Sequence, residues 1–262
     1  MFGLKRRRRQ RARRRPFPRE WLTIVKQNVA YYGLLTREEQ AELRGHMQVF
    51  LDEKRFEGCA GLEITDEIRV TLAAQACLLL LHRPTNYFPK METLLVYPQG
   101  YFAEGKQLLP GGAVLEGIQA RLGESWYRGP VVLAWDEVQY SGLRIDDGQN
   151  VVLHEFAHQL DSESGANEGV PLLPCRAMYA TWARVFGTEY AQLVEAVKLG
   201  RATAIRAYGA VSPAEFFAVA TEEFFERPTQ LKRIHPQLYE QLMTFYRQDP
   251  AERLVLSQRG PQ

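Results

Sequence analysis

A chain of 262 residues with 45% hydrophobic content can bury a sizeable core and fits one large domain or two small ones. Its three cysteines, Cys59, Cys77 and Cys175, are odd in number and widely spaced, which argues against a disulfide framework or a cysteine-ligated zinc and favours a reducing compartment. The formal net charge of +2 conceals an uneven distribution of charge along the chain.

The first 16 residues form a basic tail. Residues 5–15 contain nine lysines and arginines and no acidic residue, whereas the rest of the chain has 24 basic against 31 acidic side chains, a net charge of about −7. Because runs of like charge repel each other, we expect residues 1–16 to be disordered and residues 17–262 to form a single domain. The tail could attract nucleic acid or an anionic membrane surface by charge. It lacks interleaved aromatic residues, so we do not expect nucleic acid as a partner.

The apolar segments of the chain bear on its location. No apolar segment of the kind found in secretory signals follows the basic tail. The longest apolar run, residues 70–81, is interrupted by Thr71 and Gln75 and is too short to span a bilayer. We therefore expect a cytoplasmic protein without a membrane span.

Three segments in the first third of the chain have the apolar spacing of amphipathic helices. Residues 18–32 predict a first helix, and Thr36 opens a capping-box pattern that begins a second helix ending near Lys54. Residues 66–81 predict a third, mostly buried helix, and residues 62–64 before it predict a short strand.

Two further strands are predicted before the middle of the chain. Residues 93–97 and 131–135 are rich in β-branched and aromatic side chains and are bounded by proline and glycine. Between them, residues 100–129 are glycine-rich and irregular, a composition that suggests a hairpin.

An H-E-x-x-H motif, from His154 to His158, lies in an apolar stretch that predicts a helix beginning near Asn150. Histidines four residues apart lie on the same side of a helix, so their imidazoles can bind one metal ion. Zinc bound by two histidines and a third ligand lowers the pKa of its water to about 7, and Glu155 could take that proton. The alternative is an ordinary amphipathic helix, in which these buried polar groups would cost free energy unless paired.

Asp161 follows His158 by three residues, at the end of the motif helix. It could accept a hydrogen bond from an imidazole and fix its tautomer, or it could be a solvated residue at a helix end. The sequence leaves both interpretations open.

The C-terminal half of the chain predicts helices. They are expected at residues 177–199, 212–226 and 236–248, after a loop at residues 165–174. Strands before the motif helix and helices after it predict an α+β fold, mostly helical, with a small sheet preceding the motif helix. A substrate peptide could lie along an edge of that sheet beside the metal.

Two histidines need a third ligand, and the best candidates are carboxylates in the apolar segment 212–226. Glu215 and Glu222 are seven residues apart and share a helix face. Ser212 followed by Pro213 also makes Glu215 part of a capping box, so cap and ligand compete as its role. Glu222 could be the ligand instead, or it could hold a histidine.

The motif helix and the later glutamate segment together resemble a known family. The sequence H-E-F-A-H-Q-L-D at residues 154–161, followed by E-F-F-A at residues 215–218, is similar to the Mlc titration factor A family of zinc peptidases. It also resembles the catalytic domain of anthrax lethal factor, which pairs an H-E-F-x-H-x-x-D helix with a later Y-G-x(5)-E-F-F-A segment. Tyr208 precedes Glu215 at that spacing. The resemblance covers residues 17–248 and leaves the basic tail outside.

The resemblance implies a zincin-like metallopeptidase domain with one Zn²⁺ per chain. It makes His154, His158 and Glu215 the zinc ligands, as in gluzincins, Glu155 the general base, and Tyr208 a donor to the oxyanion. It implies a peptide substrate and leans toward aminopeptidase-like action. It also implies an alternative function with a role in sugar-uptake control: capture of a glucose-responsive transcriptional repressor, with hydrolysis secondary.

Overall fold

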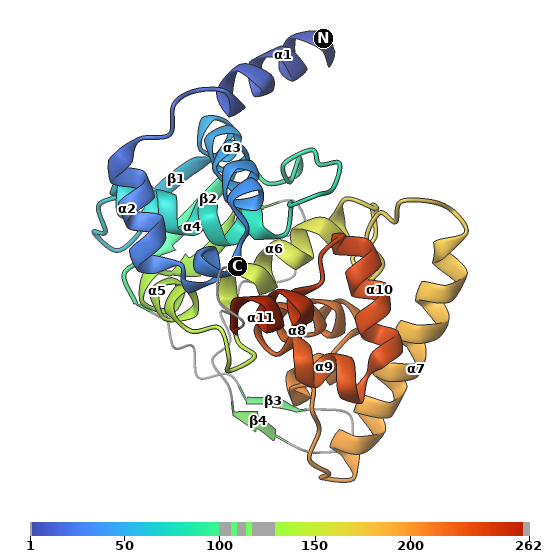
Figure 1. Cartoon of the computed structure of the whole chain (residues 1–262). Coiled ribbons are helices and arrows are strands. Elements are labelled where there is room, and N and C mark those ends of the chain that lie inside the picture. Colours follow the sequence, from blue (N-terminus) through green and yellow to red (C-terminus); the bar gives the residue numbers. More distant parts are fainter. Residues whose placement is uncertain (1, 100–105, 109–113, 117–128, 259–262) are drawn as a thin grey trace.

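A small parallel sheet lies among the helices of the N-terminal half in the computed structural model, which describes residues 2–99, 106–108, 114–116 and 129–258 (Figure 1). The sheet contains β1 (Arg55–Gly58), β2 (Thr93–Tyr97) and β5 (Val131–Ala134) in the order β1-β2-β5. Register is set by pairs such as Arg55 with Thr93 and Leu94 with Val131. The inward-facing Leu94 and Val96 are fully buried. The fold is therefore α+β, as the sequence predicts.

Two of the three predicted strands are confirmed, and one is wrong. The strand lies at residues 55–58 instead of 62–64, because a sharp turn separates these segments: Ala60 and Gly61 have φ of 51° and 81°. A Cβ on Gly58 would lie 1.8 Å from the carbonyl oxygen of Leu62, so only glycine fits there. The predicted hairpin corresponds to the antiparallel pair β3 (Lys106–Leu108) and β4 (Val114–Glu116), and the rest of residues 100–129 lies largely outside the described residues.

The N-terminal helices follow the predictions with one interruption. They are α2 (Arg19–Asn28), the 3₁₀ turn η1 (Ala30–Leu34), α3 (Arg37–Glu53) and α4 (Asp66–Leu78). The predicted helix at 18–32 breaks at Val29, whose φ of −130° leaves the helical region, and the turn that follows buries Tyr31 and Tyr32. Thr36 and Glu39 form the predicted capping box in both directions.

The C-terminal half is helical, and the motif helix α6 (Val151–Ser162) runs between it and the N-terminal helices (Figure 1). Phe156 on one side of α6 packs on Phe50 and Phe88, with ring centroids 5.6 and 4.7 Å apart. The three helices predicted after the motif helix correspond to α7 (Met178–Lys198), α8 (Pro213–Glu226) and α10 (Pro236–Tyr246). The structure adds helices that the sequence did not predict: α5 (Trp135–Leu143), η2 (Ala207–Ala210), α9 (Pro228–Ile234) and α11 (Pro250–Gln258). Among the described residues, none of the helices is both long and apolar enough to cross a membrane.

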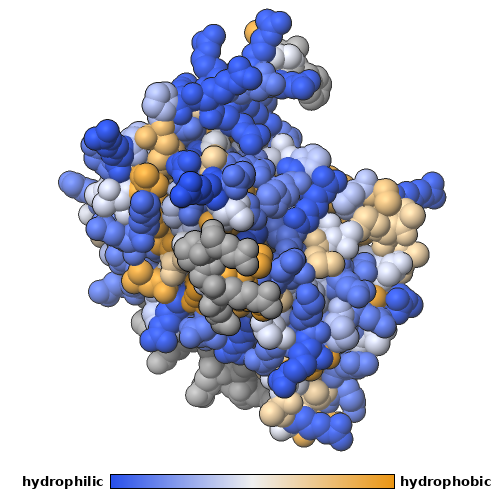
Figure 2. All heavy atoms as spheres, viewed as in Figure 1, coloured by the Kyte–Doolittle hydropathy of each residue, from blue (hydrophilic) through white to orange (hydrophobic). Residues whose placement is uncertain are grey.

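The basic tail differs from its prediction, because residues 2–13 form helix α1 (Phe2–Arg13), which packs against α3. Arg9 donates to both carboxylate oxygens of Glu53 at 2.8 Å, and Arg15 pairs with Asp52 at 2.8 Å. Ala12 is almost fully buried. Acidic side chains at the end of α3 thus offset the repulsion on which the expectation of disorder rested. Figure 2 shows the hydrophilic surface of α1 at the top of the molecule.

Candidate metal centre

Helices α6 and α8 bring the predicted site residues together, and capping interactions define where both helices begin. Asn150 is the N-cap of α6, and its side-chain oxygen accepts from the N–H of Leu153 at 2.9 Å. Ser212 is the N-cap of α8, followed by Pro213 at the first helical position. His154 and Glu215 therefore lie in the first turn of their helices, and His158 lies one turn after His154.

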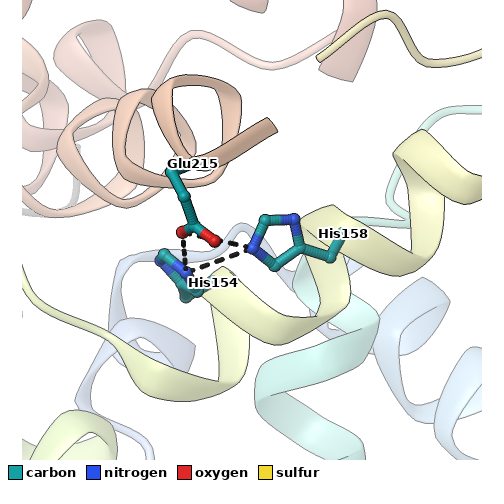
Figure 3. A group of neighbouring side chains, drawn as sticks. All are labelled: His154, His158 and Glu215. Carbon is teal, nitrogen blue, oxygen red and sulfur yellow. Dashed lines mark hydrogen bonds and ion pairs between the residues drawn. The ribbon is translucent and has the colours of Figure 1, made fainter. Parts of the chain in front are cut away.

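Three donor atoms meet where the helices face each other, as Figure 3 shows. Nε2 of His154 lies 3.3 Å from Nε2 of His158 and 3.0 Å from Oε2 of Glu215. Nε2 of His158 lies 3.4 Å from the same carboxylate oxygen. Within the described part of the chain, these residues form the one group of histidine, cysteine or acidic side chains close enough to hold a metal ion.

Glu215 contributes to the start of α8 and also faces the two histidines, through different atoms. Its backbone N–H donates to the Ser212 hydroxyl at 3.2 Å, which caps α8. Its carboxylate extends toward His154 and His158 from the first turn of that helix (Figure 3). The cap therefore fixes the backbone from which the carboxylate reaches the two imidazoles.

Glu222 contacts the far side of the His154 ring. Its Oε1 accepts from Nδ1 of His154 at 2.7 Å and also from the guanidinium of Arg206. Its Oε2 accepts from the backbone N–H of Asn150 at 2.7 Å. Of the roles left open by the sequence, the structure favours the contact with a histidine. Arg206 was not predicted as a site residue, because an arginine in a polar connecting segment carries no motif.

The electrostatics of the centre favour a positive charge between the two helices. Burial alone would lower the pKa of His154, but the charge of Glu222 and hydrogen bonds with Glu215 and Glu222 raise it to about 10. Burial would raise the pKa of Glu215, but hydrogen bonds from His154 and His158 hold it well below its usual range. A proton or a metal cation is stabilised by the same surrounding carboxylates.

Tyr208 lies beside the His154 ring, and Glu155 is close enough to Tyr208 to act on it electrostatically. Glu155 follows His154 on α6 and is partly exposed, and Tyr208 lies in η2 with its ring centroid 5.9 Å from that of His154. Burial, the charges of Glu215 and Glu155, and a hydrogen bond to Glu215 all raise the pKa of Tyr208. The phenol therefore remains a hydrogen-bond donor at neutral pH, within the electrostatic reach of both glutamates.

Asp161 corresponds to neither interpretation drawn from the sequence. It is fully buried, and its two oxygens accept from the backbone N–H groups of Gly169 and Val170 at 2.7 and 2.8 Å. It therefore ties the loop after α6 to the end of that helix. Gly169 in turn lies against the start of α8, since a Cβ there would be 2.3 Å from the carbonyl oxygen of Pro213.

Comparison with known proteins gives one family and several relatives. Residues 4–247 match the family model of the glucose-regulated metallo-peptidase M90, so the match includes most of the basic segment that we expected to lie outside the resemblance. An uncharacterised protein of Synechocystis is 41% identical over 237 residues, which cover 90% of this chain and 86% of that protein. Mlc titration factor A of Salmonella gallinarum is 32% identical over 226 residues, 85% of this chain and 84% of the relative. The Salmonella arizonae protein of that name is 32% identical over 223 residues, 84% of this chain and 88% of the relative.

Proposed function

Because the chain belongs to the glucose-regulated metallo-peptidase M90 family, a family whose name implies a divalent metal, we propose that it is a zinc-dependent peptidase with a zincin-like domain of the gluzincin type. In this proposal His154, His158 and Glu215 bind one Zn²⁺, Glu155 is the general base, and Tyr208 stabilises the oxyanion. The observation that carries the proposal is the spacing of the three donor atoms.

That spacing fits a tetrahedral zinc site. Ligand atoms about 2.0–2.1 Å from zinc in tetrahedral geometry lie about 3.3 Å from one another. The three distances between the donor atoms of His154, His158 and Glu215 are 3.3, 3.0 and 3.4 Å. Two imidazoles and one carboxylate are also the ligand set of catalytic zinc sites that keep a fourth position for water.

Glu155 and Tyr208 have the chemistry that hydrolysis needs. Bound zinc would polarise the substrate carbonyl and lower the pKa of a water molecule. Glu155, adjacent to His154 and partly exposed, can accept the proton of that water and deliver it to the leaving amine. Tyr208 keeps its proton at neutral pH and can donate a hydrogen bond to the carbonyl oxygen as that oxygen becomes negative.

Two variants and a metal analysis test the proposal. The purified protein should contain one zinc per chain and hydrolyse short peptides, and a chelator should abolish hydrolysis. Glu155→Gln should retain zinc and lose activity by a factor of about 10² or more, because only the base is removed. Glu168→Gln, an exposed carboxylate in a loop, is the matched control and should behave as wild type. Stoichiometric zinc in His154→Ala would contradict the ligand assignment.

We propose aminopeptidase-like action on short peptides as the substrate preference. A panel of peptides with free and with acetylated N-termini tests it, because an aminopeptidase needs the free amine near the scissile bond. Equal cleavage rates for the two sets would indicate endopeptidase action instead.

A second function is favoured by the names of the Salmonella relatives, which are called Mlc titration factor A. We propose as the alternative that the chain captures a transcriptional repressor, with hydrolysis secondary. A pull-down with Glu155→Gln as bait separates the two functions, because capture should survive the loss of the base. Loss of capture in this variant, at unchanged zinc content, would tie binding to catalysis.

A further inference from the structure

A buried glutamate, Glu222, joins three segments behind the candidate metal centre. We propose that Glu222 is a positioning residue: it fixes the His154 ring so that Nε2 faces Glu215 and His158. This inference rests on the proposed zinc site and goes beyond it, since Glu222 itself is seven residues from the ligand Glu215 and contributes none of the three donor atoms.

Both oxygens of Glu222 are used, and each contact restrains the start of α6. The residue is 2% exposed. Oε2 accepts from the N–H of Asn150, the N-cap of α6, and Oε1 accepts from Nδ1 of His154 one turn later, both at 2.7 Å. One carboxylate therefore sets where the helix begins and how its first histidine is oriented.

The contact with Nδ1 decides which nitrogen of His154 is available to a metal. A carboxylate can only accept, so Nδ1 must carry a hydrogen, and the lone pair available for a metal is on Nε2. A carboxylate behind a ligand histidine also increases the basicity of its imidazole. Nδ1 of His158, by comparison, is buried and has no hydrogen-bond partner among the residues that the structure describes. Within that part of the chain, His154 is thus the one of the two histidines whose far nitrogen is held by a side chain.

Arg206 gives the buried Glu222 carboxylate a further partner. A buried carboxylate is stable as an anion only when it is paired and hydrogen-bonded. The Arg206 guanidinium pairs with the same Oε1 that accepts from His154. Arg206 precedes Tyr208 by two residues, so Glu222 also connects the segment that carries the tyrosine to α8.

The test compares the same substitution at neighbouring positions. Glu222→Gln keeps the volume but has one acceptor oxygen and no charge, so His154 or Asn150 loses its partner. Its zinc affinity, measured by competition with a chromophoric chelator, should fall by about 10- to 100-fold. Glu223→Gln is the matched control, since Glu223 lies on the same helix and is also 2% exposed but pairs with Arg227 instead of a histidine. Its zinc affinity should equal that of the wild type.

Thermal unfolding without metal separates positioning from a purely structural role. Glu222→Gln should lose most of the increase in Tm that zinc gives the wild type, with a smaller change in the metal-free Tm. Wild-type zinc affinity in Glu222→Gln, whatever its stability, would overturn the inference. If that variant does not fold, Glu222→Asp is used instead: it keeps the carboxylate but shortens the side chain by one methylene, so the oxygens lie farther from His154 and Asn150. It should also bind zinc more weakly, and wild-type affinity there would equally overturn the inference. Failure of the wild type to bind zinc would instead refute the proposed function.

Discussion

Replacing Asp161 by asparagine should destabilise the protein without weakening metal binding. The carboxylate is fully buried and accepts from the N–H groups of Gly169 and Val170 through separate oxygens. Asparagine has one acceptor oxygen, so its NH₂ group must face one of these backbone donors. One buried N–H therefore loses its acceptor, and the other keeps a neutral acceptor in place of a charged one.

The expected loss in the free energy of unfolding follows from these two bonds. An unsatisfied buried donor costs about 1–3 kcal/mol, and exchanging a charged acceptor for a neutral one costs about 1 kcal/mol more. Burial raises the pKa of Asp161, because removing its carboxylate from water costs free energy. The neutral asparagine side chain avoids this cost, which offsets part of the loss. The net effect should be about 2 kcal/mol, a substantial part of the 5–15 kcal/mol typical of a folded domain.

Urea unfolding of the metal-free protein at neutral pH measures this loss as a lower midpoint. Glu168→Gln is the control, because Glu168 lies in the same loop but is exposed, and it should leave the midpoint unchanged. Zinc affinity should be the same in both variants. A loss of zinc affinity in Asp161→Asn at unchanged stability would refute this reasoning. It would indicate instead that Asp161 acts on a histidine of the metal centre.

Three other substitutions test the packing at Gly169, the buried carboxyl group of Glu226 and the docking of α1. Gly169→Ala should lower the urea midpoint markedly, because φ is +74° and the new Cβ would lie 2.3 Å from the Pro213 carbonyl oxygen; wild-type stability would contradict this. Burial raises the pKa of Glu226 to about 9, so the folded state holds a proton that the unfolded state has lost, and stability should fall as pH rises from about 5 to 9. Glu226→Gln should reduce that slope in metal-free unfolding, and an unchanged slope would exclude this group as its source. Arg9→Gln should expose α1 to faster tryptic cleavage than Arg11→Gln, which removes an exposed arginine; equal rates would mean that the pairing of Arg9 does not hold the helix.

Local patterns in the sequence were sufficient to predict most of the helices and the motif. The capping residues Thr36, Asn150 and Ser212 act within three residues of themselves, so their effect does not depend on the rest of the fold. The strands at residues 93–97 and 131–134 are apolar enough to be found from composition. By contrast, β1 has the sequence R-F-E-G and little burial, and its pairing with β2 is what makes it a strand.

The sequence alone determined which residues could bind a metal: two histidines one helical turn apart, and glutamates on an apolar helix some sixty residues later. It left Glu215 and Glu222 both open as the third ligand, and it left the role of Asp161 open, because side chains distant in sequence meet only through packing. The tertiary structure decided where these side chains lie: α8 packs on α6 with Glu215 facing Nε2 of both histidines, Glu222 behind His154, and Asp161 bonded to the adjoining loop. It also decided the state of the basic tail, since the acidic partners of its arginines lie on α3, about forty residues away along the chain.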